Sequence, residues 1–254
     1  MKGRYPVKQA LKRLLLMLQF LTTFPIRYDL RAQAVDYGKG LVYAPLVGLG
    51  IGFLLLAARA ILGYRFSPLL TAAGMVISYI IFTGGLHLDG WSDTADGVFS
   101  NRPKERMLEI MKDSRVGTYA VLALVSLIIL NILLLAEFKE RMTPFIVLMP
   151  VAGRMALPVA AGIERYARAD GLAKSFVDYC GLPEAVGGVL VYLGISLVFL
   201  GWRWLGFAVL PVIFALLVVK WLARKITGVT GDILGAVCEL TQTFYLLIAY
   251  LAMK

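Results

Sequence analysis

The sequence predicts an all-α integral membrane protein: a polytopic bundle of about seven transmembrane helices, with six as the alternative count, plus an N-terminal interfacial helix. Three observations support this fold class. Hydrophobic residues fill 59% of the 254 positions and charged residues only 17%, which is unlike a soluble domain. Apolar stretches of roughly 20 residues, the length that crosses a bilayer core, recur along the chain. Lys and Arg gather in alternate connecting segments, as they do beside membrane spans.

The first element is a short amphipathic stretch, "KQALKRLLLMLQFLTTFPI". It joins basic residues to an apolar run of about a dozen residues, which is too short for a span of roughly 20. It also lacks the small-residue cleavage site of a signal peptide. We therefore expect a helix that lies on the membrane surface.

Seven later stretches are candidates for membrane spans. The fifth and sixth are short and separated only by "WRW", so a re-entrant pair would leave six crossings. No linker or repeat divides the chain, and we expect residues 1–254 to form one catalytic membrane domain. The candidates are 41–63, 68–88, 117–136, 143–163, 185–201, 204–222 and 233–252.

The distribution of Lys and Arg predicts the orientation. With the N-terminus in the cytoplasm, the cytoplasmic segments hold 19 of these residues and the opposite side holds 5. This bias accounts for most of the net charge of +10, because the basic residues flank apolar segments and form no nucleic-acid-binding motif. We expect a lipid bilayer as partner and no nucleic acid.

The stretch "GGLHLDGWSDTADGVF" (84–99) places three aspartates at the predicted cytoplasmic end of the second span. Asp89, Asp93 and Asp96 are spaced i, i+4 and i+7, which puts them on one face of a helix. Their repulsion calls for a cation, and hard oxygen ligands suit Mg²⁺ or Mn²⁺. The neighbouring glycines, such as Gly90, permit a helix break or the close approach of a phosphate.

Two alternatives apply to this stretch. The acids could instead cap the following helix, which explains one aspartate better than three. His87, the chain's one histidine, is a candidate general base or phosphate ligand, but a lone histidine at a segment end also serves as a packing residue.

A second polar stretch, "MKDSRVGTY" (111–119), precedes the third span. A helix start with nearby Lys and Arg is a natural anion site. We therefore expect Lys112, Asp113, Ser114 and Arg115 to contribute to phosphate or substrate binding. The alternative is an ordinary basic flank of a membrane span.

Arg154 falls in the middle of the fourth span, within "PVAGRMALP". An unpaired cation there would cost several kcal/mol, so Arg154 needs an anionic partner, either a protein carboxylate or a substrate phosphate. Pro150, Gly153 and Pro158 suggest a locally broken helix that faces a cavity.

The last span begins "GVTGDILGAVCELTQ" and carries a second acidic stripe, Asp232 and Glu239 at i and i+7. Carboxylates inside a membrane are usually functional. We expect a second metal or substrate contact here; alternatively, Glu239 simply pairs with Arg154.

Three of these stretches are motifs that resemble, in order and approximate spacing, those of the cobalamin synthase family (adenosylcobinamide-GDP ribazoletransferase, cobalamin-5'-phosphate synthase). They are "GGLHLDGWSDTADGVF", "MKDSRVGTY" and "GVTGDILGAVCELTQ". The similarity extends to "LQFLTTFPI" and "YAPLVGLGIG" and so covers nearly the whole chain. It implies a Mg²⁺-dependent enzyme of the prokaryotic cytoplasmic (inner) membrane. Such an enzyme joins adenosylcobinamide-GDP to α-ribazole or its 5'-phosphate, releases GMP and forms adenosylcobalamin or its 5'-phosphate.

A mechanism follows as a hypothesis. Asp89, Asp93 and Asp96 would hold the metal, and Lys112, Arg115 and Arg154 would contact the remaining phosphate oxygens. Asp96 or His87 would take the proton of the acceptor hydroxyl. Two alternatives are an intramembrane prenyltransferase that acts on a magnesium diphosphate and a cation transporter. For the oligomeric state, the sequence is compatible with a homo-oligomer.

Overall fold

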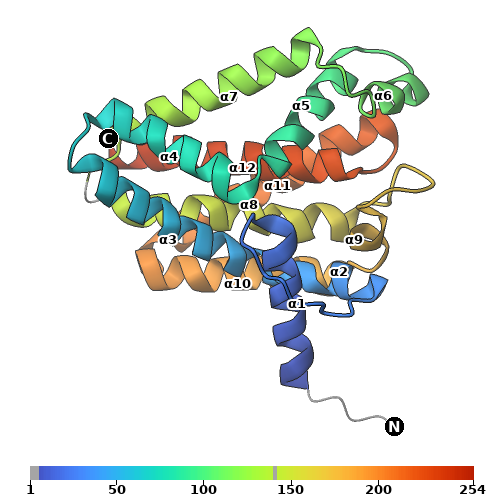
Figure 1. The fold of residues 1–254 in the computed structure, drawn as a ribbon, viewed down its shortest axis with the longest axis horizontal. Coiled ribbons are helices and arrows are strands. Elements are labelled where there is room, and N and C mark those ends of the chain that lie inside the picture. Colours follow the sequence, from blue (N-terminus) through green and yellow to red (C-terminus); the bar gives the residue numbers. More distant parts are fainter. Residues whose placement is uncertain (1–5, 140–141) are drawn as a thin grey trace.

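The computed structural model describes residues 6–139 and 142–254, and this part of the chain folds almost wholly into α-helices (Figure 1). Its β pairing in these residues is one isolated bridge between Tyr166 and Val229. The longest helices run side by side along the long axis of the molecule, whereas α1 lies across them (Figure 1). The predicted all-α fold class is confirmed.

Short helices separate the long ones. In chain order the elements are α1 (Pro6–Leu21), α2 (Ala34–Gly40), η1 (Leu41–Tyr43), α3 (Ala44–Gly63), α4 (Pro68–Thr83), α5 (Leu86–Phe99), α6 (Lys104–Ile110), α7 (Thr118–Glu137), α8 (Thr143–Ile163), α9 (Lys174–Asp178), α10 (Leu182–Leu200), η3 (Trp202–Trp204), α11 (Leu205–Ile226) and α12 (Gly231–Met253).

Six segments of the described chain are long and apolar enough to span a membrane, and the bent pair α4–α5 would make a seventh. The predicted count of seven, with six as the alternative, therefore agrees with the structure. The predicted span 68–88 is longer than the helix in the structure, because α4 ends at Thr83 and the chain turns by 94° into α5. At "WRW" the structure agrees with two separate spans, and not with the alternative of a re-entrant pair: α10 and α11 are long helices joined by η3.

The centre of the bundle is α8, which is buried along nearly its whole length. It packs against α3, α10, α11 and α12. Small residues permit these approaches: a Cβ added at Gly48 of α3 would lie 2.5 Å from the carbonyl oxygen of Pro150. Close backbone contact through small residues is typical of helices packed in membranes.

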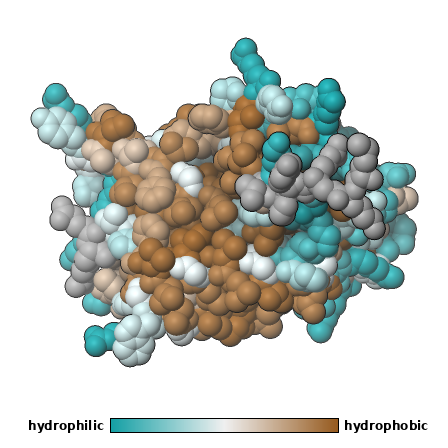
Figure 2. Space-filling view, turned by 90° about the horizontal axis from the view of Figure 1, so that it is seen from below, coloured by the Kyte–Doolittle hydropathy of each residue, from teal (hydrophilic) through white to brown (hydrophobic). Residues whose placement is uncertain are grey.

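The outer surface carries a broad hydrophobic band, with polar residues gathered toward the end of the bundle that holds α2 and α9 (Figure 2). Exposed apolar side chains on α3 and α10 include Phe53, Ile61, Leu190 and Val198. Such a surface would be insoluble in water but is well solvated by lipid. It indicates an integral membrane protein.

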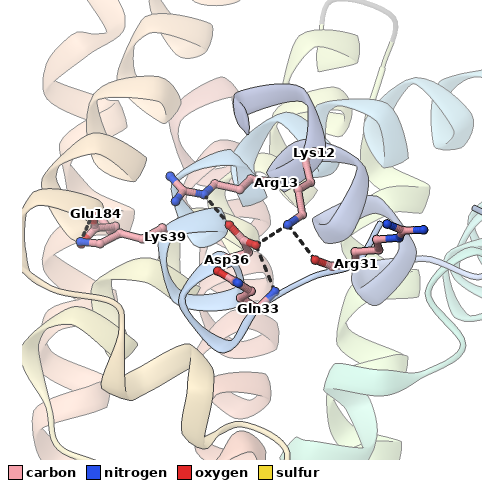
Figure 3. A network of polar contacts seen from close by, with 7 residues as sticks. All are labelled: Lys12, Arg13, Arg31, Gln33, Asp36, Lys39 and Glu184. Carbon is pink, nitrogen blue, oxygen red and sulfur yellow. Dashed lines mark hydrogen bonds and ion pairs between the residues drawn. The ribbon is translucent and has the colours of Figure 1, made fainter. Parts of the chain in front are cut away.

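Helix α1 is attached to the bundle by ion pairs (Figure 3). The buried carboxylate of Asp36 in α2 accepts from Lys12 Nζ at 2.6 Å and from Arg13 Nε at 3.3 Å. Lys39 of α2 in turn pairs with Glu184 of α10 at 2.7 Å. These contacts fix the predicted N-terminal helix against the bundle.

The segment after α1 contacts the end of α4, just before α5 begins. Thr23, two residues after α1, donates its backbone N–H to the carbonyl oxygen of Phe82, at the end of α4, at 2.8 Å. The sequence predicts that α1 lies at the membrane surface, and this hydrogen bond would then put the end of α4 at the same level. Because α5 carries three carboxylates within 14 residues, we take α4 as the membrane-crossing part of the bent pair and place α5 outside the membrane-spanning segments.

Candidate active site

The turn between α4 and α5 is made by two consecutive glycines in the left-handed region. Gly84 has φ 62° and Gly85 has φ 69°, a conformation that residues with a Cβ adopt at a cost. The helix break expected from the glycines is therefore confirmed at this point. This turn directs α5 away from the axis of α4, with a bend of 94° between the two helices.

Helix α5 carries the three predicted aspartates on a single helix, as their spacing requires. Asp89 is exposed, and Asp93 and Asp96 are half-buried. Most of the residues between them, Trp91 and Thr94 among them, are buried against the rest of the protein. The aspartates therefore occupy the accessible side of α5.

A close helix contact brings the second acidic stripe to this side. A Cβ at Gly90 would lie 2.8 Å from the carbonyl oxygen of Asp232, and one at Gly235 would lie 3.1 Å from the Cα of His87. Only glycine allows α5 and α12 to approach so closely. Gly90 thus permits the close contact of a neighbouring helix, and the close approach of a phosphate stays a prediction.

Three carboxylates then lie within electrostatic reach of one another. Burial, followed by repulsion from Asp89 and Asp232, raises the pKa of Asp93 to about 7. Carboxylates gathered in this way favour either a shared proton or a bound cation. The combination of α5 with the start of α12 is the central feature of the site.

Arg168 supplies the positive charge that sequence reasoning missed. It lies in the loop after α8, and its Nη2 donates to Asp232 Oδ2 at 2.9 Å. Both side chains are largely buried. In the sequence, Arg168 is one of several basic residues in the loop between two predicted spans, and no local pattern distinguishes it from its neighbour Arg165.

A cavity of about 400 Å³ opens beside these groups. Its polar lining includes His87, Asp89, Arg168 and Asp232, and its other walls come from α1, η1, α8 and α9. The volume falls within the range of small-molecule sites. A pocket on which several charged side chains converge is the best candidate for an active site.

Asp96 points elsewhere. Its two oxygens accept from the backbone N–H of Gly117 at 2.6 Å and of Ala120 at 2.8 Å, at the start of α7. A carboxylate stabilises a helix N-terminus by satisfying these donors and opposing the helix dipole. The capping alternative thus applies to one aspartate of the three. The metal-binding and catalytic roles of Asp96 stay predictions.

The "KDSR" segment forms an exposed loop between α6 and α7. Arg115 Nη2 pairs with Asp113 Oδ2 at 2.7 Å, and the hydrogen bonds from Arg115 lower the pKa of Asp113 to about 2. Lys112 and Ser114 are exposed. The structure connects this loop to α5 through Gly117 and Asp96, but its residues do not line the 400 Å³ cavity. Its role in phosphate binding stays a prediction.

Arg154 and Glu239 lie in the interior of the bundle. Arg154 Nη1 donates to Tyr79 Oη and to Gln242 Oε1, both at 2.8 Å, and Tyr79 in turn donates to Glu239. The expected pairing of Arg154 with Glu239 is thus relayed through Tyr79. Both charged side chains are buried and absent from the cavity lining. Their predicted contact with substrate is therefore untested.

The predicted break in α8 around Arg154 is wrong. The helix is continuous from Thr143 to Ile163 across Pro150 and Pro158. Neighbouring helices pack closely at both prolines, since Gly48 faces Pro150 and Gly188 faces Pro158. Tertiary packing compensates for the backbone hydrogen bonds that proline removes.

His87 connects the cavity to this interior network. It lines the cavity, while its Nδ1 lies 3.5 Å from Cys238 Sγ. Among the described residues, His87, Cys238 and Glu239 form the one group with three ligand atoms within 4.8 Å of one another. The aspartates of α5 and α12 are therefore spaced more openly than a closed metal cage.

Comparison with known families now bears on this site. A family model described as cobalamin-5-phosphate synthase matches residues 13–250. The chain belongs to the cobalamin-5-phosphate synthase family. The resemblance inferred from the three motifs is confirmed.

Curated relatives agree with the cobalamin-5-phosphate synthase assignment. Proteins named adenosylcobinamide-GDP ribazoletransferase from Clostridium acetobutylicum and Acetivibrio thermocellus are each 49% identical to this chain. The alignments cover 94% of the chain and 96% of the first relative, and 95% of the chain and 98% of the second. A protein of the same name from Alkaliphilus oremlandii is 38% identical over 95% of the chain and 98% of its own length. No solved structure matches the chain.

Proposed function

We propose that this member of the cobalamin-5-phosphate synthase family transfers the adenosylcobinamide-phosphate moiety of adenosylcobinamide-GDP to α-ribazole or α-ribazole 5'-phosphate. The reaction releases GMP and forms adenosylcobalamin or its 5'-phosphate, with Mg²⁺ as cofactor. Three kinds of support converge: the family, the names of relatives up to 49% identical, and the charged cavity.

The observation that carries the proposal is that Asp89 of α5 and Asp232 of α12 line one cavity, and that both carboxylates act electrostatically on Asp93 of α5. Mg²⁺ is usually held by one or two carboxylates together with waters and substrate phosphates, and seldom by an all-protein cage. The open spacing of the aspartates and the raised pKa of Asp93 fit such a site. When bound, the ion would neutralise charge on the diphosphate.

The protein side chains have distinct tasks in this reaction. Asp89, Asp93 and Asp232 would hold the metal, and the forked guanidinium of Arg168 would offer donors to phosphate oxygens. The acceptor hydroxyl oxygen forms a bond to the phosphorus that carries the cobinamide, and the bond from that phosphorus to GMP breaks. The hydroxyl proton passes to His87 or to a carboxylate at the cavity.

The site faces the cytoplasm of a prokaryotic cell in this proposal. The end of the bundle that carries α5, α6 and α9 belongs to the side with 19 Lys and Arg residues against 5 on the other. A soluble nucleotide substrate and Mg²⁺ would reach it directly there. The proposal puts α1 on the same side.

GMP release by purified protein in detergent or nanodiscs tests the proposal. We expect GMP from adenosylcobinamide-GDP only when α-ribazole or its phosphate and Mg²⁺ are both present, with loss of the reaction in EDTA. Asp89→Asn should reduce turnover by roughly tenfold to a hundredfold, because removal of one carboxylate weakens metal binding. The control Asp178→Asn changes an exposed pair with Lys174 and should keep wild-type turnover. Equal turnover by Asp89→Asn and wild type would refute the role of Asp89 in metal binding, and no GMP release by wild type would refute the proposed reaction.

A further inference from the structure

The 400 Å³ cavity is lined by two chemical kinds of residue, charged and apolar. Its charged lining, Asp89, Arg168 and Asp232, comes from α5, the loop after α8, and α12. Other lining residues are apolar, and we call this part of the lining the apolar wall; the metal and phosphate chemistry leaves it unused. This wall is formed by Phe20, Leu21, Leu41, Leu86, Leu157 and Phe176.

Aromatic side chains from distant parts of the sequence meet in this wall. The ring of Phe20, at the end of α1, lies 4.6 Å from that of Phe176 in α9, measured between centroids. Tyr37 of α2 also contacts Phe176 edge-on, with 5.3 Å between ring centroids. Phe176 is buried, whereas Phe20 is 38% exposed, so the cluster presents an accessible aromatic surface.

Size limits what this wall can contact. The cavity would hold one heterocyclic nucleoside, since its volume lies at the lower end of the range for small-molecule sites. A corrinoid macrocycle with its side chains is far larger and must remain outside. The guanine of the donor carries several hydrogen-bonding groups, and an apolar wall would leave them unpaired.

We propose that this aromatic wall is the binding subsite for the flat, apolar base of the acceptor nucleoside. The inference rests on the proposed function and extends it. The dimethylbenzimidazole ring of α-ribazole carries two methyl groups and lacks exocyclic hydrogen-bonding groups, so it is matched by phenylalanine and leucine side chains. Stacking and edge contacts with Phe20 and Phe176 hold the base. Its ribose then lies toward Asp89 and Asp232, and the corrinoid stays at the cavity mouth.

Direct binding of α-ribazole to the purified protein in nanodiscs tests this subsite, with thermal unfolding as a check on folding. Replacement of an aromatic residue that stacks on a base weakens binding on the order of tenfold. We expect a loss of this size for Phe176→Ala and for Phe20→Ala, with GDP binding unchanged. Phe20→Ala serves as the second variant because Phe20 is partly exposed and its loss should not prevent folding. The matched control, Phe214→Ala, removes a ring stacked on Phe244 away from the cavity and should bind α-ribazole normally.

The outcomes separate this inference from the proposed function. If wild type binds α-ribazole and releases GMP, but the two variants bind α-ribazole normally, the subsite is wrong and the function stands. If the variants lose co-purified phospholipid and keep α-ribazole affinity, the wall is a lipid site and the inference fails. If wild type neither binds α-ribazole nor releases GMP, both proposals fail.

Discussion

Asp93→Asn should make the metal-free protein more stable while it abolishes activity. The pKa of Asp93 rises from 3.8 to about 7 in the folded protein, mainly through burial and then through repulsion by Asp89 and Asp232. At about 1.4 kcal/mol per tenfold change in proton affinity, this corresponds to at most about 4 kcal/mol of destabilisation. Asp93 is only half-buried, and solvent screening reduces the figure to about 1–2 kcal/mol.

The direction of the pH dependence of stability follows from proton binding to Asp93. Between pH 4 and 7 the folded protein holds the Asp93 proton more tightly than the unfolded chain does, so stability falls as pH rises through this window. The full penalty is present above pH 7, and asparagine removes it. For a protein of this size, about 1–2 kcal/mol corresponds to a rise of roughly 2–8 °C in Tm.

Thermal unfolding in detergent with EDTA, at pH 8 and at pH 5.5, measures this effect. We expect Asp93→Asn to unfold at a higher temperature than wild type at pH 8, with a smaller difference at pH 5.5. Mg²⁺ should raise the Tm of wild type more than that of the variant, because ligands stabilise the state they bind. A variant less stable than wild type at pH 8 would show that the carboxylates do not repel one another.

Three further predictions concern neighbouring residues. Gly90→Ala should lower stability by about 1–3 kcal/mol and reduce GMP release, because its Cβ would lie 2.8 Å from a backbone oxygen of α12; an unchanged Tm would argue against the close helix contact. Asp96→Ala should lower the Tm, since it removes two hydrogen bonds at the start of α7 worth about 1–2 kcal/mol, and calorimetry of Mg²⁺ binding by the same variant decides whether Asp96 is also a ligand. Arg154→Met should destabilise the protein by about 3–5 kcal/mol, because it leaves Glu239 buried without its relayed partner; wild-type stability would contradict this.

Local features of the site were predictable from the sequence. The i, i+4, i+7 spacing of the aspartates is a property of the backbone and survives any tertiary arrangement. The paired glycines at 84 and 85 likewise indicated a break, because few other residues adopt two successive positive φ angles. The long apolar helices followed from bilayer thickness.

Tertiary relations were not predictable in the same way. Asp96 is indistinguishable from Asp93 in the sequence, and only the packing of α7 against α5 directs its oxygens to backbone donors. Arg168 carries no local signal and is identified by its contact with Asp232 across 64 residues of chain. The prolines of α8 suggested a break that close packing of neighbouring helices prevents.

The most direct test of the account is the binding of Mn²⁺, as a paramagnetic substitute for Mg²⁺, to the purified protein followed by electron paramagnetic resonance in the presence of GDP. We predict a bound ion in wild type and in Asp178→Asn, and loss of the bound signal in both Asp89→Asn and Asp232→Asn, because α5 and α12 share the site. Retention of the ion by both of these variants would contradict a metal centre formed by the two helices.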